Sequence, residues 1–401
     1  MVSWLVYYAF FLIAAIPFIY YLIVLYSTWR FFHVSAKQKL SAAEFTPPVT
    51  ILKPVRGLDP DAYENFASFC RQDYPEYEII FCVGDRNDPA LGVVERVMQE
   101  FPDCRVRVLF GSGRVATNDK VAKLARLTEE ARYEYLVIND SDVRAESDYL
   151  RRVVAPLADP SVGAVTCFYA PIDEKTLVQH LQSVGMLSDF YAGILVAWQL
   201  DGVKFALGPT IATTRARLEG FGGYQVIENR PADDLLVGRL IAEQGAEVKL
   251  LPYSVLTVAD YDSLRDLFNK RLRWIVVMRN MRPWGHIGLI FTFGLPWALA
   301  VMFVRPTLAV AAGYLGSYLV LRCLMTWLIG GWGLKHRVSW QKYALIPLWD
   351  AMAAVIWLVS FTRRTILWRG HKYFIRDGQL VPAVHIPAQE LPAEEAVKTG
   401  S

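Results

Sequence analysis

The stretch Tyr135-Leu-Val-Ile-Asn-Asp-Ser-Asp142 joins a short apolar run to an acidic end. Its first four residues are apolar without alternation, which is typical of a strand buried on both faces of a sheet. Asn139, Asp140, Ser141 and Asp142 follow at once. In open α/β sheets, ligands bind beyond the carboxyl ends of the strands. The stretch therefore predicts a buried strand that delivers two carboxylates, on Asp140 and Asp142, to a ligand-binding crevice.

The residues before this stretch alternate between strand-like and helix-like patterns. We expect strands at residues 49–55, 78–83 and 105–110, and helices at residues 63–71, 91–101 and 121–132. Strands that alternate with helices are typical of βαβ units and of a largely parallel sheet. The pattern therefore predicts an α/β domain with a mostly parallel sheet, which we place at residues 47–284.

A second acidic loop follows the strand expected at residues 78–83, and it contains Asp85 and Asp88. The spacing of Asp140 and Asp142 suits a hard divalent cation, Mg²⁺ or Mn²⁺, that would hold diphosphate oxygens. The same residues are also common in ordinary turns, because Asp and Ser cap helices and favour turns. The sequence has no Walker A and no GxGxxG motif, which weakens the kinase and dehydrogenase interpretations.

Two further motifs lie between this region and the carboxyl-terminal third. Asp233 and Asp234 stand at an expected helix start, where carboxylates interact favourably with the helix dipole or can act as a general base. The run Lys270-Arg-Leu-Arg-Trp274 precedes an apolar segment. It is either a juxtamembrane basic patch against anionic lipid or a cation and an indole placed against a diphosphate or a sugar.

Composition excludes several classes of protein. The 401 residues are 54% hydrophobic with a mean hydropathy of +0.25, so the chain has ample apolar surface for folding and is not disordered. Its 42 Lys and Arg against 39 Asp and Glu give a net charge of only +3, weaker than a dedicated nucleic-acid binder shows. Five cysteines occur without a CxxC pair, which argues against a zinc site and a disulfide-built fold.

The amino terminus predicts a membrane anchor. Residues 4–26 carry no charge, enough to cross a hydrocarbon core of roughly 30 Å as a helix. No basic segment precedes this run and no cleavage site follows it, so we expect an anchor within residues 1–30 rather than a signal peptide. Arg30, His33, Lys37 and Lys39 follow it, and the positive-inside rule then places the downstream chain in the cytoplasm.

The carboxyl-terminal third predicts more membrane segments, within residues 285–365. Apolar runs occupy residues 287–304, 307–332 and 343–361, and the first contains Pro296. Three full crossings would place the basic stretch 363–376 outside, against the positive-inside rule. We therefore expect one segment, 287–304, to be re-entrant or interfacial. Residues 366–401 form a tail, whose polar end at 387–401 is expected to be disordered.

The order of these motifs resembles that of membrane-bound family 2-type glycosyltransferases, and in particular the ceramide glucosyltransferase family, glycosyltransferase family 21. In that order a strand-end Asp is followed by a DxD motif, an acidic pair and an xxRW motif beside a membrane segment. The resemblance extends over residues 49–373. It is carried by residues 52–59, 73–78, 82–89, 118–120, 140–141, 233–234, 273–274 and 368–373.

The resemblance implies a GT-A fold, that is, a Rossmann-like cytoplasmic domain with flanking transmembrane helices. It also implies roles on the donor side of the site. Asp85, with Asp88 close by, would face the uridine of a UDP-sugar. Asp140 and Asp142 would lie at the Mg²⁺ or Mn²⁺ ion. Lys53 and Lys120 are further donor-site candidates.

On the acceptor side, the resemblance implies that Asp234 is the general base. Arg273 and Trp274 match the RW of the family's (Q/R)xxRW motif. Lys270 departs from the motif's first position, and a lysine cannot make the bidentate contact of an arginine. Residues 190–198 either shape the path of the acceptor or form a buried core helix, and 205–209 with 221–224 resemble a pair of sugar-binding loops.

The reaction that the resemblance implies is transfer of glucose from UDP-glucose to ceramide with inversion. Partners would be a UDP-sugar and a membrane lipid. The setting would be the plasma membrane of a bacterium or the Golgi of a eukaryote; we expect a multi-pass protein of a bacterial inner membrane, because the sequence contains no eukaryotic retention signal that we can identify. One alternative is transfer of N-acetylglucosamine from its UDP-sugar to a hopanoid lipid. A processive polysaccharide synthase would have a longer membrane region and a Gln at the first motif position. A non-enzymatic lipid-binding or transport protein is the other alternative, which the acidic motifs disfavour.

Overall fold

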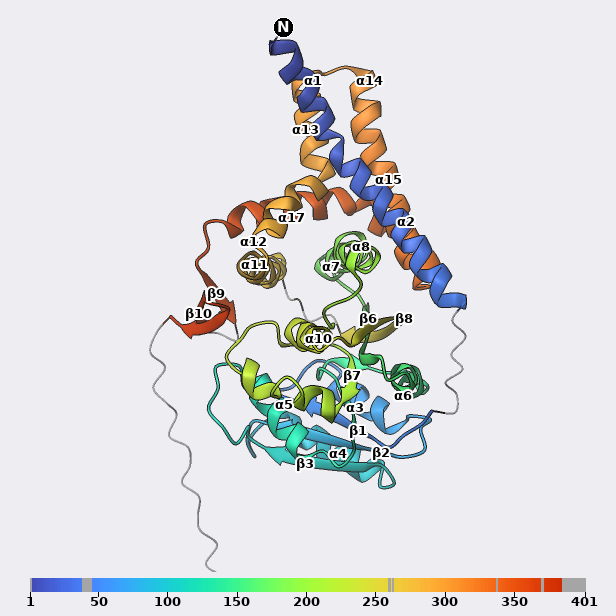
Figure 1. Ribbon diagram of the computed structural model, residues 1–401, viewed down its shortest axis with the longest axis vertical. Helices are drawn as coiled ribbons and strands as arrows, with labels where there is room; N and C mark the ends of the chain where they lie inside the picture. Colours follow the sequence, from blue (N-terminus) through green and yellow to red (C-terminus); the bar gives the residue numbers. More distant parts are fainter. Residues whose placement is uncertain are drawn as a thin grey trace, which may run out of the picture.

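The computed structural model describes residues 2–37, 45–258, 261, 263–336, 338–368 and 371–383. The expected polar tail at 387–401 lies outside the described residues. The sheet and its helices form one end of the molecule, and apolar helices project from the other (Figure 1). All five cysteines are free thiols.

One eight-stranded sheet organises the α/β domain, in the order β3-β2-β1-β4-β7-β6-β8-β5. Pairing is parallel between β1 and β2, β2 and β3, β1 and β4, and β6 and β8. It is antiparallel where β7 meets β4 and β6, and where β5 meets β8. The mostly parallel sheet is therefore confirmed. The strands are β1 (Val49–Pro54), β2 (Tyr77–Val83), β3 (Arg105–Phe110), β4 (Tyr135–Ile138), β5 (Val143–Arg144), β6 (Val162–Ile172), β7 (Ile211–Thr214) and β8 (Glu247–Val258).

The three expected helices of the first half are present, each within two residues of its predicted bounds, as α3, α4 and α5. Later helices cover the second half of the sheet. The helices of this domain are α3 (Ala62–Cys70), α4 (Ala90–Glu100), α5 (Asp119–Glu130), α6 (Tyr149–Val154), α7 (Leu177–Gly185), α8 (Tyr191–Asp201), α9 (Arg215–Glu219) and α10 (Asp233–Glu243), with the short 3-10 segments η2 (Ala155–Ala158) and η4 (Tyr224–Ile227) and the π-helical η3 (Met186–Phe190).

Both faces of the sheet are buried, which explains the unbroken apolar runs of its strands. Ile51 and Val137 pack in the layer that includes α3, α4 and α6. Their neighbours Leu52 and Leu136 pack in the opposite layer, with α5. Successive side chains of a strand point to opposite faces. A strand covered by helices on both sides therefore needs apolar residues at every position.

The register aligns the carboxyl ends of the three strands that matter for the site. Leu52 of β1 pairs with Ile138 of β4, and Pro54 of β1 pairs with Cys82 of β2. The loops that follow these strands consequently leave the sheet at one edge, as expected for an α/β ligand crevice.

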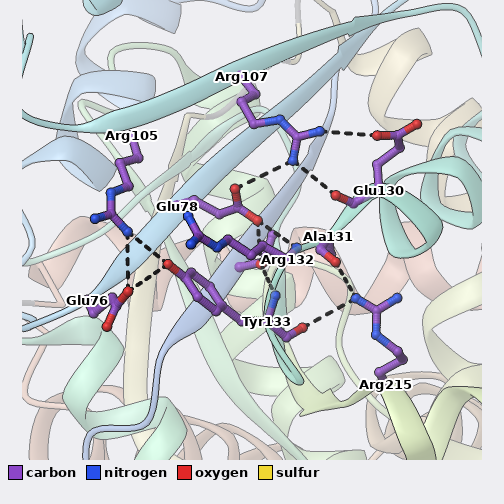
Figure 2. Close-up of polar contacts among 10 residues, drawn as sticks. Glu76, Glu78, Arg105, Arg107, Glu130, Ala131, Arg132, Tyr133 and Arg215 are labelled. Carbon is purple, nitrogen blue, oxygen red and sulfur yellow. Dashed lines mark hydrogen bonds and ion pairs between the residues drawn. The ribbon is translucent and has the colours of Figure 1, made fainter.

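The opposite edge is held by a polar network around Glu78 (Figure 2). The buried Glu78 carboxylate accepts hydrogen bonds from the hydroxyl of Thr50 (2.9 Å) and the backbone N–H of Arg132 (2.8 Å). Arg107 lies 3.6 Å away and also donates to the backbone carbonyl of Glu130. These contacts fasten β1 and β2 to the end of α5, so this edge has a structural role.

The first candidate membrane span is the apolar helical stretch Trp4–Ser35, which lies within α1 (Val2–Ala14) and α2 (Ile16–Lys37). A second stretch, Leu308–Gly333, is also long and apolar enough to cross a membrane. It comprises α14 (Leu308–Val310), η6 (Ala311–Gly316), α15 (Ser317–Thr326) and η7 (Trp327–Gly333).

The segment expected to be re-entrant is bent by 54° between Pro283–Thr292 and Gly294–Val304. The break precedes α13 (Gly294–Val304), whose first turn contains Pro296; proline is tolerated there because the N–H groups of a first turn have no helical partner. Counted as one span, this pair makes three candidate spans among the described residues; otherwise there are two. The other elements before the tail are α12 (Pro283–Gly288), η5 (Leu289–Thr292), α16 (Trp340–Ala344) and α17 (Ile346–Ser360).

Between the sheet and the apolar helices lie α7, α8, α11 (Leu264–Met281) and α17 (Figure 1). Buried Arg322 of α15 pairs with Asp350 of α17 and donates to the carbonyl of Ser188 in η3. An ionic group among apolar helices needs such partners, so this cluster fixes η3 against the membrane segments. A small antiparallel sheet of β9 (Thr365–Trp368), β10 (His371–Arg376) and β11 (Gln379–Pro382) packs beside α11.

Candidate active site

The candidate site starts at β1, where Lys53 is fully buried. Its Nζ donates to the backbone carbonyl of Asp140 (3.1 Å) and lies 3.5 Å from the ring centroid of Phe69. Burial lowers the pKa of Lys53 to about 7, although the carboxylates of Asp142 and Asp140 oppose that shift. Lys53 therefore fixes the backbone of the acidic turn, residues 139–142, through its hydrogen bond to Asp140.

The acidic turn itself follows β4 directly. Asn139 is buried and donates to the hydroxyl of Tyr149 and to the carbonyl of Pro209, both at 2.7 Å. The hydroxyl of Ser141 donates to the carboxylate of Asp59, which belongs to the loop after β1. Asp140 lies between Asn139 and Ser141, and Asp142 follows Ser141. The contacts of Asn139 and Ser141 with neighbouring loops therefore hold both aspartates in place.

Lys120 links this turn to the second acidic motif. Its Nζ lies 2.6 Å from Oδ1 of Asp140 and 3.1 Å from Oδ2 of Asp233. Burial by itself would lower the pKa of Lys120, but the carboxylates of Asp140, Asp233 and Asp234 raise it well above its ordinary value. Lys120 is therefore a fixed positive charge among three carboxylates.

Two helix starts meet to bring these residues together. Asn118 caps α5 by accepting from the N–H of Val121, and its amide donates to the carbonyl of Arg230 (3.1 Å), just before α10. Ala232 then adopts a left-handed conformation, with φ of 57°, immediately before Asp233. That conformation is unfavourable for a residue with a Cβ and is often retained at functional sites. It turns the chain so that α10 begins with the two aspartates.

Gly208 lies between Asp140 and Asp234. Its N–H donates to Oδ2 of Asp234 (2.9 Å). A Cβ at this position would lie 3.1 Å from Oδ2 of Asp140 and 3.2 Å from Oδ2 of Asp234. The carboxylates of the DxD turn and of α10 therefore converge on one small space, and a Cβ at position 208 would require them to shift by a few tenths of an ångström.

The clustered negative charge changes the pKa values of two carboxyl groups. Burial, with the charges of Asp140 and Asp59, raises the pKa of Asp142 to about 7. Burial and the charge of Asp233 raise the pKa of Asp234 to about 6, while Lys120 acts in the opposite direction. A carboxylate with a raised pKa near neutrality is suited to accept a proton.

The two aspartates after β2 differ in their environment. Asp85 is exposed, and its Oδ1 accepts from the N–H of Asn87 (2.7 Å). The Asp88 carboxylate instead accepts from the backbone N–H groups of Gly57, Gly84 and Ala90. Asp88 thus ties the loops after β1 and β2 together, and Asp85 is the one of the pair whose side chain faces solvent.

The basic motif, residues 270–274, lies on α11, which packs on the apolar helix α17. The Trp274 ring packs 5.9 Å from the ring of Phe190, and the Arg273 guanidinium lies 5.9 Å from the ring of Trp368. Lys270 pairs with Asp266 (3.2 Å), one turn earlier. Lys270 is therefore held by a residue of the same helix, and Arg273 and Trp274 are held by aromatic rings of neighbouring segments.

The residues at the DxD turn suit a divalent cation in chemistry. Asp140 and Asp142 supply the hard oxygen donors that Mg²⁺ and Mn²⁺ prefer. Burial and the charge of Asp140 raise the pKa of Asp142, and a cation would offset that charge. Lys120 already occupies one oxygen of Asp140. Among the described residues no group of three or more His, Cys, Asp or Glu forms a metal-binding cluster, so a ligand or water would have to complete the coordination.

Sequence patterns did not single out two residues that shape this site, Asp59 and Gly208. They lie in segments 52–59 and 205–209, which the sequence indicates for other reasons. A glycine before a proline is a common turn, so only the positions of Asp140 and Asp234 reveal why a glycine stands at 208.

The sequence and the fold are both similar to those of known proteins. A family model described as "Glycosyl transferase family 21" matches residues 9–381. The chain is 22% identical over 376 residues to Ceramide glucosyltransferase 1 of Caenorhabditis elegans, covering 88% of this chain and 76% of that protein. It is 35% identical over 155 residues to a ceramide glucosyltransferase of Komagataella phaffii, covering 36% and 30% of the two chains.

Among solved structures, a mannosyltransferase from Pyrobaculum calidifontis in complex with GDP-Man and Mn²⁺ has a similar fold. The TM-score is 0.56 at 19% identity, and the match covers 86% of this chain and 99% of that one. The predicted fold class is therefore confirmed as a mixed α/β, GT-A-like fold with a mostly parallel sheet and flanking apolar helices.

Proposed function

Because this chain belongs to glycosyl transferase family 21, we propose that it is a membrane-bound, inverting enzyme that moves a hexose from a UDP-sugar to a lipid hydroxyl. The specific pair we propose is UDP-glucose and ceramide. The relationship to ceramide glucosyltransferases, at 22% identity over most of both chains, supports this choice. The lipid acceptor also fits a chain with two to three apolar helices that could cross a membrane.

The proposed donor site lies at the carboxyl ends of β1, β2 and β4. Asp85 would contact the uridine, with Asp88 holding its loop in place. Lys53 and Lys120 would set the charge of the pocket that receives the diphosphate. Lys120 supports this assignment because its ammonium already bridges two carboxylates, at 2.6 and 3.1 Å, and so remains charged at neutral pH.

A divalent cation, Mg²⁺ or Mn²⁺, would be held by Asp140 and Asp142. When bound, such an ion would offset the charge that develops on the departing diphosphate. The mannosyltransferase of similar fold was solved with Mn²⁺, which supports a cation of this type.

Asp234 is the proposed general base. In the step we propose, the Asp234 carboxylate takes the proton of the lipid hydroxyl, and the oxygen forms a bond to the anomeric carbon. The bond from that carbon to the UDP oxygen breaks, and UDP leaves with its electron pair. A single displacement of this kind inverts the anomeric configuration and gives a β-glycoside from an α-linked donor.

The basic motif would serve the leaving group and the acceptor. Arg273 is proposed to neutralise charge on the diphosphate as UDP departs, with Lys270 one turn away as a second cation. Trp274 would present its indole to the sugar or to the lipid near the reaction centre. The position of α11 between the sheet domain and the apolar helices supports such a shared role (Figure 1).

The carboxylates of Asp140 and Asp234 carry the proposal, because both lie next to the same glycine. This proximity supports a base beside the proposed donor site, as a single displacement requires. By the positive-inside rule, the sheet domain would lie on the cytoplasmic face, in a bacterial inner membrane.

The test uses purified full-length protein in detergent with Mg²⁺ or Mn²⁺. UDP-glucose and UDP-N-acetylglucosamine are each offered with ceramide, diacylglycerol and a hopanoid polyol, and the products are identified by mass spectrometry. The proposal expects glucosylceramide as the main product. Transfer only to the hopanoid would retain the mechanism but replace both substrates, and no product with any pair would contradict the proposed reaction.

A further inference from the structure

Arg271, on α11, is a buried arginine whose hydrogen bonds are incomplete among the described residues. Its side chain is 7% exposed, and neither Nε nor Nη2 has a hydrogen-bond partner among the described residues. Leaving charged donors buried without partners is costly. Arginine in such a position therefore indicates that something outside the folded chain completes its hydrogen bonds.

The two unpartnered nitrogens lie on the same edge of the guanidinium. The N–H of Nε and one N–H of Nη2 point in one direction, and together they form a fork that two oxygen atoms can accept. The rings of Trp274 and Trp349 flank the group at 4.8 and 4.9 Å from their centroids. These rings pack on the guanidinium and fix its position, and the edge that carries Nε and Nη2 is buried without a hydrogen-bond partner among the described residues.

The position of Arg271 associates it with the acceptor rather than with the nucleotide. Trp349 belongs to α17, the short apolar helix that packs on α11. Along the long axis of the molecule, α11 lies between α17 and α10, which carries Asp234 (Figure 1). A lipid headgroup that moves from the apolar helices toward Asp234 would therefore pass α11.

Charged and polar neighbours agree with that position. Burial raises the pKa of Asp189, and the charges of Arg322 and Arg271 act against this shift. Burial also raises the pKa of Tyr169, which lies within electrostatic reach of both Arg271 and Asp234. Arg271 thus stands in a polar group that continues from the junction with the membrane helices to the proposed base.

We propose that Arg271 is an acceptor-binding residue whose Nε and Nη2 hold two oxygen atoms of the lipid headgroup next to Asp234. This inference rests on the proposed function. The ligand class is a membrane lipid that carries two neighbouring oxygen acceptors close to its reactive hydroxyl; in ceramide these are an amide carbonyl and a second hydroxyl. The residue would orient the headgroup so that one hydroxyl reaches Asp234.

The experiment compares Arg271→Met, Arg271→Lys and the unmodified protein, all as full-length chains in lipid nanodiscs. Arg279→Met is the matched control, because Arg279 lies on the same helix but donates to the backbone carbonyls of Ser360 and Arg363. Michaelis constants are measured for ceramide at saturating UDP-glucose and for UDP-glucose at saturating ceramide. Binding of a fluorescent ceramide without nucleotide gives a second readout.

Arg271→Met is expected to raise the KM for ceramide at least ten-fold and to weaken ceramide binding equally, with the KM for UDP-glucose within two-fold of normal. The KM for ceramide of Arg271→Lys should lie between those of Arg271→Met and the unmodified protein, since lysine keeps the charge but not the forked pair of donors. Methionine retains packing between the two rings, and Arg322 still acts on Asp189, so Arg271→Met should leave the thermal midpoint nearly unchanged. Arg279→Met should lower the midpoint and leave both constants unchanged.

An unchanged KM for ceramide in Arg271→Met, or an increase confined to UDP-glucose, would overturn the inference while leaving the proposed function intact. Loss of stability in Arg271→Met without a change in ceramide binding would identify a structural role instead. An unmodified protein that binds ceramide but transfers nothing to it would overturn the proposed function alone. Failure to bind ceramide at all would overturn both.

Discussion

The backbone N–H of Gly208 donates a hydrogen bond to Oδ2 of Asp234 at 2.9 Å. A side chain at position 208 would also meet Oδ2 of Asp140 at 3.1 Å. This contact joins the loop before β7 to the start of α10 and the DxD turn after β4. Three segments far apart in the sequence thus define the space in which we place the reaction.

The first prediction concerns Gly208→Ala. The added methyl group would displace one or both carboxylates by a few tenths of an ångström, and small misplacements of reacting groups can cost up to about 100-fold in rate. We expect kcat to fall by about ten- to 100-fold with little loss of thermal stability, because the backbone at Gly208 is not left-handed. The measurement is kcat with UDP-glucose and ceramide, beside the thermal midpoint.

Gly193→Ala is the matched control for this change. Gly193 lies in α8, and a Cβ there would have no atom within 4 Å. That variant should retain full activity. Equal activity of the two variants would contradict the convergence of Asp140 and Asp234 on Gly208.

The second prediction is a pH dependence. Burial and Asp233 raise the pKa of Asp234 to about 6, and a general base acts only when it is deprotonated. The value of kcat/KM should therefore fall as pH falls through about 6 and level off above it. Initial rates between pH 5 and 8, at constant ionic strength, measure this limb.

Lys120→Met tests the assignment of that limb to Asp234. The ammonium of Lys120 lowers the pKa of Asp234, so its removal should shift the limb to higher pH. A limb that stays in place when Lys120 is replaced would show that another group controls it.

The third prediction concerns the metal. Chelation with EDTA should abolish transfer, and Mn²⁺ or Mg²⁺ should restore it, because Asp140 and Asp142 supply hard oxygen donors. Asp142→Asn should need a higher concentration of the cation for half-maximal activity. Full activity after exhaustive chelation would contradict a role for a divalent cation.

The fourth prediction separates stability from catalysis. Glu78→Ala removes a buried carboxylate that accepts from Thr50 and Arg132 at the edge of the sheet opposite the site (Figure 2). Leaving such donors unsatisfied costs about 1–3 kcal/mol, so the thermal midpoint should fall. The KM values of the folded fraction should not change; a rise in either would show that this edge is coupled to the site.

Local patterns were sufficient for the first half of the sheet. Predominantly apolar runs predicted β1, β2 and β4, and the helices between them followed from their spacing, because both signals arise within a few residues. The antiparallel β7 was not predicted. Its four residues, Ile211–Thr214, gain their place by pairing with β4 and β6, and such long-range pairing has no local signature.

The sequence was sufficient to name the acidic residues of the candidate site, but it did not predict which side chains contact one another. The bridge from Lys120 to Asp233 depends on two helix starts that meet through Asn118. Likewise, the spacing of Arg271 and Arg273 on α11 predicts that they point in different directions, because successive helical residues are about 100° apart. Only the packing of α17 on α11 decides that Arg271 is the buried one.

The most direct test of the proposed function is glucose transfer to ceramide by Asp234→Asn, which keeps the shape of the side chain but removes its basicity. Glu243→Gln, at the exposed end of α10, is the control. We predict that Asp234→Asn lowers kcat by about 10²- to 10⁴-fold, the usual contribution of a general base, and that Glu243→Gln matches the unmodified protein. Transfer by Asp234→Asn at the unmodified rate would contradict the account.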